Sequence, residues 1–483
     1  MFYQKGPNAF IEEMVSNIIQ QPLEWHNRDV WLIFLARFIR NLSYGSMATI
    51  LLRYLFSIGL DASEVGSILF SIMVGDLCIT LYLTASADSV GRVKVLVFGS
   101  VLKLIAGLVF ANTTSFYWLL ASGVLGVINP VGVEIGPYLA TEQAALTDVV
   151  VRIHMSSSSC HNYSMTKSSM VVTSKLADIF GYYNALGFIA SAAGNIVGGQ
   201  IVQDLENVYG QLFAFKMMFV FYSAMATCMI IVYLMLSSNT EADKEFYALT
   251  ASITSPIDDT SEWYYFGLRR PRSRKLMGYS SILFALDAFA GGFVIPTSVV
   301  LWLIKRWDFD SSKVGYILSA TSLVCGLSSI FTGSMVKRCG TVETIIYTQI
   351  PANVFVMLIP LMPTATSAVA MLVLRFSLSM MAMPATQAYV TTLVSSSERS
   401  AAGGISNVVR SLGLAFSTIP LAYLQSSSPS SLTFSSPFYL CGGLKMLYCL
   451  FLYLFYMLTK KPSKNPSKAI SQQQAEEQPL LQN

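Results

Sequence analysis

Residues 61–69 read DASEVGSIL and residues 310–318 read DSSKVGYIL, so that six of nine positions are identical. Without a gap, the same offset of 249 residues carries Gly91 onto Gly340. Farther along, the pair QA at 143–144 recurs at 387–388, and the pattern GxxN at 181–184 recurs at 404–407. The chain therefore consists of two similar halves.

Apolar residues dominate both halves. Of 483 residues, 53% are hydrophobic and 12% are charged, whereas an average soluble protein is about 25% charged. Twelve apolar segments are long enough to span a bilayer, at about 30–53, 63–84, 93–112, 115–140, 179–203, 209–236, 276–304, 312–336, 341–361, 365–389, 400–425 and 435–459. We predict an all-α integral membrane protein with twelve transmembrane helices in two pseudo-symmetric six-helix halves.

The distribution of Lys and Arg predicts the orientation in the membrane. With the N-terminus inside, the cytoplasmic segments contain twenty basic residues, and the external loops and helix ends contain four. Because cytoplasmic loops carry an excess of basic residues, both termini are predicted to be cytoplasmic. The predicted organisation is a cytoplasmic N-terminal segment at 1–29, a first half at 30–236, a central cytoplasmic loop at 237–275, a second half at 276–459 and a disordered cytoplasmic tail at 460–483.

The offset between the halves is not constant. It falls from 244 residues at Gln143 to 223 residues at Gly181, which places about 21 extra residues in the first half. Serines gather there, at 156–159 and 168–169. We expect a disordered, Ser-rich cytoplasmic insert at about 152–174.

Two six-helix halves joined by a long loop are typical of secondary transporters, whose site lies between the halves. Residues 84–94, TASADSVGRVK, resemble the loop signature between the second and third helices of the major facilitator superfamily. Residues 333–340, GSMVKRCG, are similar to its second copy, with Lys337 in place of the acid. The resemblance extends from about residue 30 to 460, and it implies this fold and a transport function without indicating the substrate.

The signature loop also has a physical role that can be read from its residues. Gly91 permits a tight turn at the membrane surface, and Asp88 can accept charge-assisted hydrogen bonds from Arg92 or from a neighbouring helix end. We expect such contacts to hold the halves together on the cytoplasmic side in one state; a plain basic loop is the alternative. The predicted cytoplasmic gate comprises Asp88, Gly91, Arg92, Lys94, Gly333, Arg338 and Gly340.

The fifth apolar segment contains small residues at helical spacing, namely Gly181, Gly194, Gly198 and Gly199. The segment is similar to the glycine-rich signature of the family's antiporters, although Ala190 replaces a glycine and Asn195 replaces the proline. Small residues also let helices approach closely in lipid. We therefore predict a helix-packing role, with a specific antiport role as the alternative.

Ionisable residues inside a membrane are costly and are candidates for function. The resemblance implies that the first, fourth, seventh and tenth helices line a central cavity. Each of these carries a charge, and together Arg40, Glu134, Asp287 and Arg375 form the predicted substrate and proton site. We expect Asp287 to pair with Arg40 in one state and to take up a proton in another. Glu134 is the competing proton carrier, and structural ion pairs that never titrate are the alternative.

Other charged residues also fall within the apolar segments. For most of them, helix pairing or snorkelling to the membrane surface is the predicted role. These residues are Asp76, Lys103, Lys216, Arg410 and Lys445, and Arg37 is placed near the lipid interface.

Several functions are disfavoured by the sequence. It contains no GxxxxGK[ST] pattern for ATP, and the three histidines lack metal-ligand spacing. We predict no enzymatic activity, no cofactor, no metal and no nucleic-acid partner, and we expect a monomer in the lipid bilayer. The tail contains EEQPLL, in which Glu476, Leu480 and Leu481 resemble an acidic dileucine signal for sorting adaptors. A vacuolar or endosomal membrane, or the plasma membrane, is the expected location.

The sequence thus predicts a secondary active transporter of a small organic solute, with proton-coupled export or antiport by alternating access favoured. A proton symporter or a facilitator for uptake is the alternative within transport. A non-transporting receptor or scaffold on the same fold is the alternative from another class.

Overall fold

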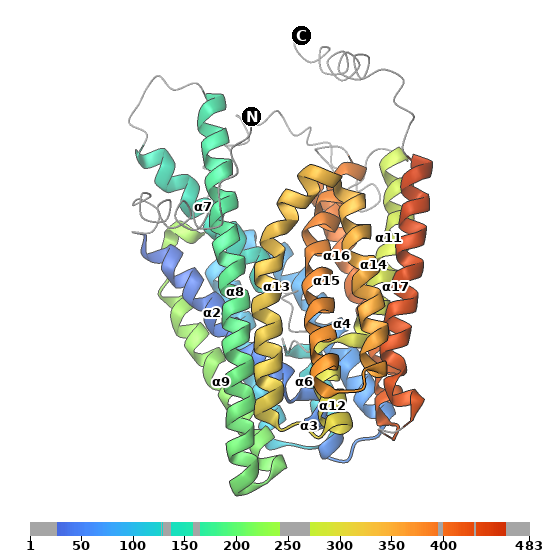
Figure 1. The fold of residues 1–483 in the computed structure, drawn as a ribbon. Coiled ribbons are helices and arrows are strands. Elements are labelled where there is room, and N and C mark those ends of the chain that lie inside the picture. Colours follow the sequence, from blue (N-terminus) through green and yellow to red (C-terminus); the bar gives the residue numbers. More distant parts are fainter. Residues whose placement is uncertain are drawn as a thin grey trace, which may run out of the picture.

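The computed structural model describes residues 27–126, 128, 137–157, 165–241, 271–394, 399–428 and 431–459. Within these residues the regular elements are helices, most of which run along one axis of an elongated bundle (Figure 1). The first half contains α2 (Arg28–Ala48), α3 (Leu51–Ser57), α4 (Ala62–Val90), α5 (Arg92–Asn112), α6 (Phe116–Leu125), α7 (Pro137–Ser157), α8 (Met165–Tyr209) and α9 (Gln211–Leu234), and the central loop begins with η1 (Ser238–Thr240). The second half contains α11 (Pro271–Gly291), η3 (Gly292–Val294), α12 (Pro296–Trp307), α13 (Ser311–Cys339), α14 (Thr341–Leu358), η4 (Ile359–Leu361), α15 (Ala365–Leu393), α16 (Arg399–Ser426) and α17 (Leu432–Thr459).

Among the described residues, ten helical passages are long and apolar enough to cross a membrane. The first and fourth predicted segments are not among these ten: the first contains α2 and α3, and the fourth contains α6 and the start of α7, with residues 127 and 129–136 outside the described residues. The predicted all-helical membrane fold is confirmed, and ten of the twelve predicted spans meet the length and hydropathy expected of a membrane helix.

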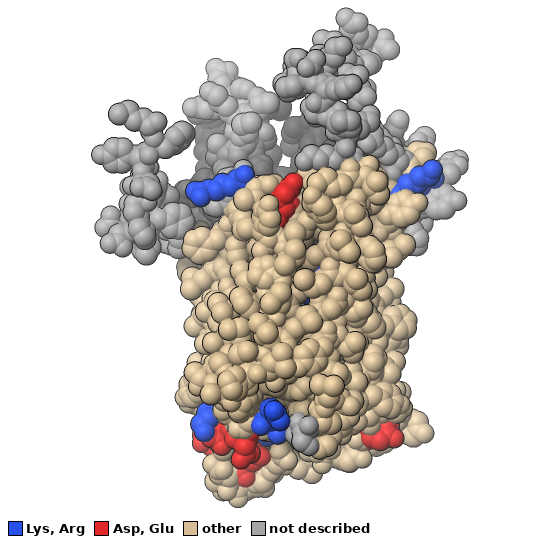
Figure 2. Space-filling model, turned by 45° about the vertical axis from the view of Figure 1, so that its right-hand side comes forward, with Lys and Arg blue, Asp and Glu red and all other residues tan. Residues whose placement is uncertain are grey.

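The surface agrees with a position in a bilayer. Figure 2 shows charged side chains near the two ends of the bundle and a band of uncharged side chains between them. Such a band can face hydrocarbon, where charges are costly. We call the end at which α2 begins and α17 ends the terminal end, and the opposite end, which carries α3 and α12, the loop end (Figure 1).

The two halves meet through helices that the internal repeat relates. α8 packs on α13, and α4 packs on α16. The repeated stretches at 61–69 and 310–318 open α4 and α13, with Asp61 and Asp310 at the N-cap positions. Since the GxxN repeat similarly relates α8 to α16, the two contacts use equivalent pairs of helices, and the interface between the halves is pseudo-symmetric.

Glycines let α8 approach its neighbours closely. A Cβ on Gly194 would lie 2.1 Å from the carbonyl oxygen of Leu42 in α2, and one on Gly198 would lie 2.8 Å from the next turn of that helix. A Cβ on Gly199 would lie 2.7 Å from a carbonyl oxygen of α13, whereas one on Gly181 would meet no atom within 4 Å. Three of the four predicted packing glycines therefore lie at tight helix contacts, and Gly181 does not.

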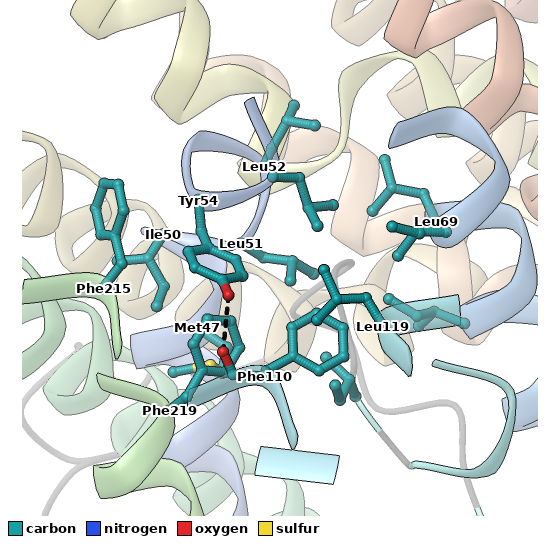
Figure 3. Packing of buried hydrophobic residues seen from close by; sticks show 14 of the residues in the cluster. Met47, Ile50, Leu51, Leu52, Tyr54, Leu69, Phe110, Leu119, Phe215 and Phe219 are labelled. Carbon is teal, nitrogen blue, oxygen red and sulfur yellow. Dashed lines mark hydrogen bonds between the residues drawn. The ribbon is translucent and has the colours of Figure 1, made fainter. Parts of the chain in front are cut away.

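A hydrophobic core surrounds the break between α2 and α3 (Figure 3). Tyr54 of α3 lies among Met47, Leu51 and other buried side chains, and its hydroxyl donates a hydrogen bond to the carbonyl oxygen of Phe110 at 2.8 Å. That carbonyl belongs to the last turn of α5, where main-chain oxygens lack helical partners. The hydrogen bond therefore joins α3 to the end of α5.

The fourth apolar segment was predicted to end at residue 140, but the helix α7 continues beyond that point. α7 extends to Ser157, and α8 begins at Met165. Both ends of the predicted insert at about 152–174 are therefore helical, and residues 158–164 lie outside the described residues. Also outside them are Glu134, most of the central loop, and the tail with Glu476, Leu480 and Leu481.

Candidate functional site

A cavity of about 190 Å³ lies between the two halves. α2 and α8 line it from the first half, and six long helices line it from the second half. Most of the wall is apolar or carries small polar groups, and its charged side chains are Asp287, Arg375, Arg410 and Lys445. A concave site of this composition, with a few convergent polar groups, is the usual form of a small-molecule site.

Asp287 of α11 lies at the centre of the charged part of the wall. Lys445 Nζ of α17 donates to Asp287 Oδ1 at 2.6 Å, and Arg410 Nη1 of α16 is 3.3 Å from Asp287 Oδ2. One carboxylate thus ties three helices together. Helix pairing, the role predicted for Arg410 and Lys445, is what the structure shows, but both residues also line the cavity and were left out of the predicted site.

Arg375 of α15 lines the same charged part of the wall but forms no ion pair with a carboxylate in the described residues. Its guanidinium lies 4.2 Å from the ring centroid of Phe376 and donates a weak hydrogen bond to Cys441 Sγ at 3.9 Å. The side chain is 5% exposed. The charged part of the wall therefore combines three cations with one carboxylate.

Two amide side chains provide unused hydrogen-bond acceptors in the wall. Asn195 of α8 donates its Nδ2 to Ser322 Oγ of α13 at 3.2 Å, a contact that joins the two halves. Within the described structure, Asn195 Oδ1 and Gln349 Oε1 accept no hydrogen bond, and these side chains are only 3% and 5% exposed. Leaving a buried acceptor unpaired costs about 1–3 kcal/mol, so both oxygens favour a donor from outside the protein.

Polar contacts fasten the two halves together at the loop end. Arg53 Nη1 of α3 donates to Ser311 Oγ at 2.7 Å, and Ser311 N donates to Gln203 Oε1 of α8 at 2.9 Å. Glu206 of α8 accepts from Ser311 Oγ at 3.3 Å and lies 3.5 Å from Arg53 Nη2. The start of α13 is therefore tied to both α3 and α8 on this side of the cavity.

Arg40 of α2, a predicted site residue, lies instead in a buried ion pair within the first half. Its Nη1 and Nη2 are 2.5 and 2.7 Å from the two carboxylate oxygens of Glu142 on α7. Tyr183 of α8 and Tyr233 of α9 donate their hydroxyls to the same carboxylate. The expected pair between Arg40 and Asp287 is not formed, because each of them has a partner in its own half.

The signature loop forms the turn between α4 and α5. Gly91 has a φ of +113°, which favours glycine, and the next residue, Arg92, is 1% exposed. Arg92 Nη1 lies 2.8 Å from Asp148 Oδ2 of α7, and Glu241 accepts hydrogen bonds from the backbone N–H groups of Arg92 and Val93 at 2.6 and 3.1 Å. Asp148 belongs to the first half, and Glu241 lies at the start of the central loop. The side chain of Asp88 lies outside the described residues, and the gating role remains a prediction.

The second copy of the loop keeps the turn without the buried arginine. Gly340 has a φ of +101° and stands between α13 and α14. Arg338 is exposed, as is Lys94 in the first copy. A Cβ on Gly333 would meet no atom within 4 Å, so this glycine makes no tight contact.

Among the other predicted membrane charges, Lys103 is fully buried in the first half. Its Nζ donates to Ser43 Oγ at 2.6 Å and lies 4.5 Å from the ring centroids of both Tyr44 and Tyr222. Arg37 is also buried, and it lies over the Tyr183 ring at 4.1 Å. Neither of these two cations lines the cavity.

Comparison with known proteins agrees with the fold. A family model described as Major Facilitator Superfamily matches residues 280–482. The chain is 27% identical over 400 residues to the uncharacterized membrane protein YJR124C of Saccharomyces cerevisiae, an alignment that covers 79% of this chain and 84% of the yeast protein.

Solved transporter structures share the architecture of the whole bundle. The nucleoside transporter NupG superimposes with a TM-score of 0.64 at 13% identity, covering 90% of this chain and 100% of NupG. A POT family transporter in complex with a thioalcohol-conjugated peptide gives 0.62 at 14% identity, with 90% and 97% covered. A bacterial homologue of the human lysosomal transporter Spinster, in an inward-facing and occupied conformation, gives 0.60 at 14% identity, with 90% and 98% covered.

These findings agree with the internal repeat, the signature loop at 84–94 and the cavity between the two halves. The family model matches the second half, and the structural likeness extends to the first. Residues 280–482 are therefore similar to the Major Facilitator Superfamily, and the described bundle has the fold of the solved transporters.

Proposed function

We propose that the protein is a proton-coupled secondary active transporter, which moves a small organic solute through the cavity by alternating access. The observation that carries this proposal is the cavity itself, which lies between the two halves and has a buried, ion-paired carboxylate in its wall. The loop-end contacts of Ser311 support a state in which that side of the cavity is closed. Movement between two such states would expose the same site to each side of the membrane in turn.

Asp287 is the proposed proton carrier. Its carboxylate holds α11 to α16 and α17 through Arg410 and Lys445. A proton on Asp287 would remove the negative charge that pairs with both cations. Lys445, which is buried, would then lack a partner, and such a state is strongly disfavoured. Protonation would therefore loosen these three helices unless another anion replaced the carboxylate, which links the proton to the conformation of the second half.

Two observations bear on whether the proton and the solute cross the membrane in the same direction or in opposite directions. The glycine-rich α8, similar to the antiporter signature, supports export or exchange. The pairing of Asp287 with Lys445 and Arg410 supports the alternative, a proton symporter, because a proton on the carboxylate frees two cations to hold the solute. We favour symport for this reason.

Proteoliposomes that enclose a pH-sensitive dye test the proposal. Addition of a transported solute should change the internal pH, and an imposed pH gradient should drive accumulation of that solute. Asp287→Asn should abolish both effects while preserving solute exchange. Asp310→Asn is the control, since Asp310 is an exposed N-cap residue of the same half and Asn serves equally well there.

If Asp287→Asn still accumulates solute with the wild-type pH dependence, the carrier has been misassigned. Absence of any solute-dependent pH change in the wild type, together with downhill solute flux, would make the protein a facilitator.

A further inference from the structure

The described residues of the cavity wall carry more positive than negative charge. Three cations, Arg375, Arg410 and Lys445, share one carboxylate, and Asp287 is the sole acid among the described lining residues. An excess of two positive charges in a site surrounded by membrane-spanning helices is costly. An anion from solution would offset this cost.

We propose that the transported solute is a small organic anion, whose carboxylate or phosphate group is held by Arg375 together with Lys445 and Arg410. This proposal rests on the proposed transport function and adds the chemical class of the substrate. Arg375 is the principal recognition residue because its guanidinium has no carboxylate partner among the residues described, and stacking on Phe376 fixes its plane. A planar guanidinium donates two parallel hydrogen bonds to a carboxylate or a phosphate.

The rest of the wall narrows the class further. Asn195 Oδ1 and Gln349 Oε1 are buried acceptors without a donor, so the anion should carry a hydroxyl or amino group. Phe188 and Met380 add apolar wall for a short carbon skeleton. The volume of about 190 Å³ lies below the roughly 300 Å³ at which drug-sized pockets begin, which favours a small metabolite over a large drug.

The anion also accounts for proton coupling. The titratable and charged groups that act on Asp287 come from three helices: Arg375 of α15, Arg410 of α16, and Lys445, Tyr448 and Cys449 of α17. A proton on Asp287 raises the net charge of the site by one, and a bound monoanion lowers it again by one. The site with both ligands thus has the same charge as the empty site, whereas the site with the proton alone has a larger excess. Proton and anion should therefore bind cooperatively and cross together.

Binding to purified full-length protein in lipid nanodiscs tests the substrate class without requiring transport. Thermal unfolding is measured with monocarboxylates, dicarboxylates and phosphate monoesters that carry hydroxyl or amino groups. The matched uncharged controls are the corresponding amides and methyl esters, and simple amines serve as cationic controls. At least one anion should raise the unfolding temperature, since a ligand that binds the native state stabilises it, and its uncharged counterpart should not. Stabilisation by amines or neutral compounds, with none by any anion, would overturn the proposal.

Variants locate the site. Arg375→Gln should weaken binding of the anion at least tenfold, and Arg375→Lys should retain part of the affinity. Lys313→Gln removes an exposed cation of the same half and should bind as the wild type does. Asp287→Asn should bind the anion more tightly than the wild type at neutral pH and without the wild-type dependence on pH. Unfolding temperatures without ligand show whether each variant is folded, and wild-type affinity in a folded Arg375→Gln would refute the assignment.

The substrate class and the transport function fail in different ways. Anion binding that depends on Arg375, without uptake into liposomes, would remove the transport function and keep the anion site. Proton-driven accumulation of a cation or of a neutral solute would keep the transport function and remove the anion.

Discussion

Replacing Glu142 by Gln should destabilise the first half by about 3–5 kcal/mol. Glu142 and Arg40 are both fully buried, and their two contacts measure 2.5 and 2.7 Å. Removing one partner of such a pair leaves an uncompensated buried charge, which costs about 3–5 kcal/mol. Because Gln keeps the length and shape of the side chain, packing changes little and the loss is chiefly electrostatic. Since about 1.4 kcal/mol corresponds to a factor of ten in an equilibrium constant, the ratio of folded to unfolded protein falls by about two to four powers of ten.

The assay is thermal unfolding of purified protein in detergent, followed as the loss of the monodisperse species. Glu64→Gln is the matched control, because Glu64 is only partly buried and Gln can replace it in the capping box of α4. The effect of this control should stay within about 0.5 kcal/mol. Combining Glu142→Gln with Arg40→Gln removes the orphaned charge and should recover part of the loss. Equal stability of Glu142→Gln and Glu64→Gln, or no recovery in the double variant, would refute the reasoning.

Two further predictions concern helix contacts. Gly194→Ala should lower the free energy of unfolding by about 1–3 kcal/mol, since the added Cβ would lie 2.1 Å from the Leu42 carbonyl oxygen. Gly181→Ala is the control, because its Cβ would meet no atom within 4 Å and should be tolerated. Thermal unfolding of both variants tests this prediction, and equal losses of stability would contradict it. Arg53→Gln removes the guanidinium that Ser311 and Glu206 contact and should loosen closure at the loop end. A cysteine introduced at Ser322, in the cavity wall, should then react faster with a membrane-impermeant thiol reagent from that side, and an unchanged rate would show that these contacts do not hold the closed state.

The fold was predictable because a bilayer limits what a chain can do. Each spanning helix needs about 20 apolar residues and satisfies its own backbone, so composition and periodicity locate the helices. The fourth passage was misjudged because residues after 140 are more polar. The internal repeat indicates the correct end of this helix. Gln143 matches Gln387, which lies inside α15, so the equivalent helix α7 is expected to continue past residue 142. Glu142, the partner of Arg40, was missed for this reason alone.

The partners of the membrane charges were harder to predict than their positions. Asp287 and Arg375 line the cavity. The pairing of Asp287 with Lys445 and Arg410 depends on which faces of α11, α16 and α17 meet, and the spacing of residues along one helix does not specify the rotation of its neighbour. α11 packs directly on both of these helices, so an acid on it finds cations within its own half before it can reach Arg40.

The two buried charge clusters differ in a way that separates their roles. In the first half, Arg40 and Glu142 balance each other, two tyrosine hydroxyls complete the carboxylate's hydrogen bonds, and the pair does not line the cavity. Such a cluster has nothing left to offer a ligand, and it fixes α2, α7, α8 and α9 relative to one another. In the second half, Asp287 is shared by more cations than it can balance, at the cavity wall. In the proposed cycle, Asp287 would take up a proton while an anion replaces it as the partner of the cations, and the net charge of the site would stay the same. Under the proposed function, the first half would therefore supply the rigid part of the transporter, and the second half would supply both the recognition of the solute and the helices that rearrange around it.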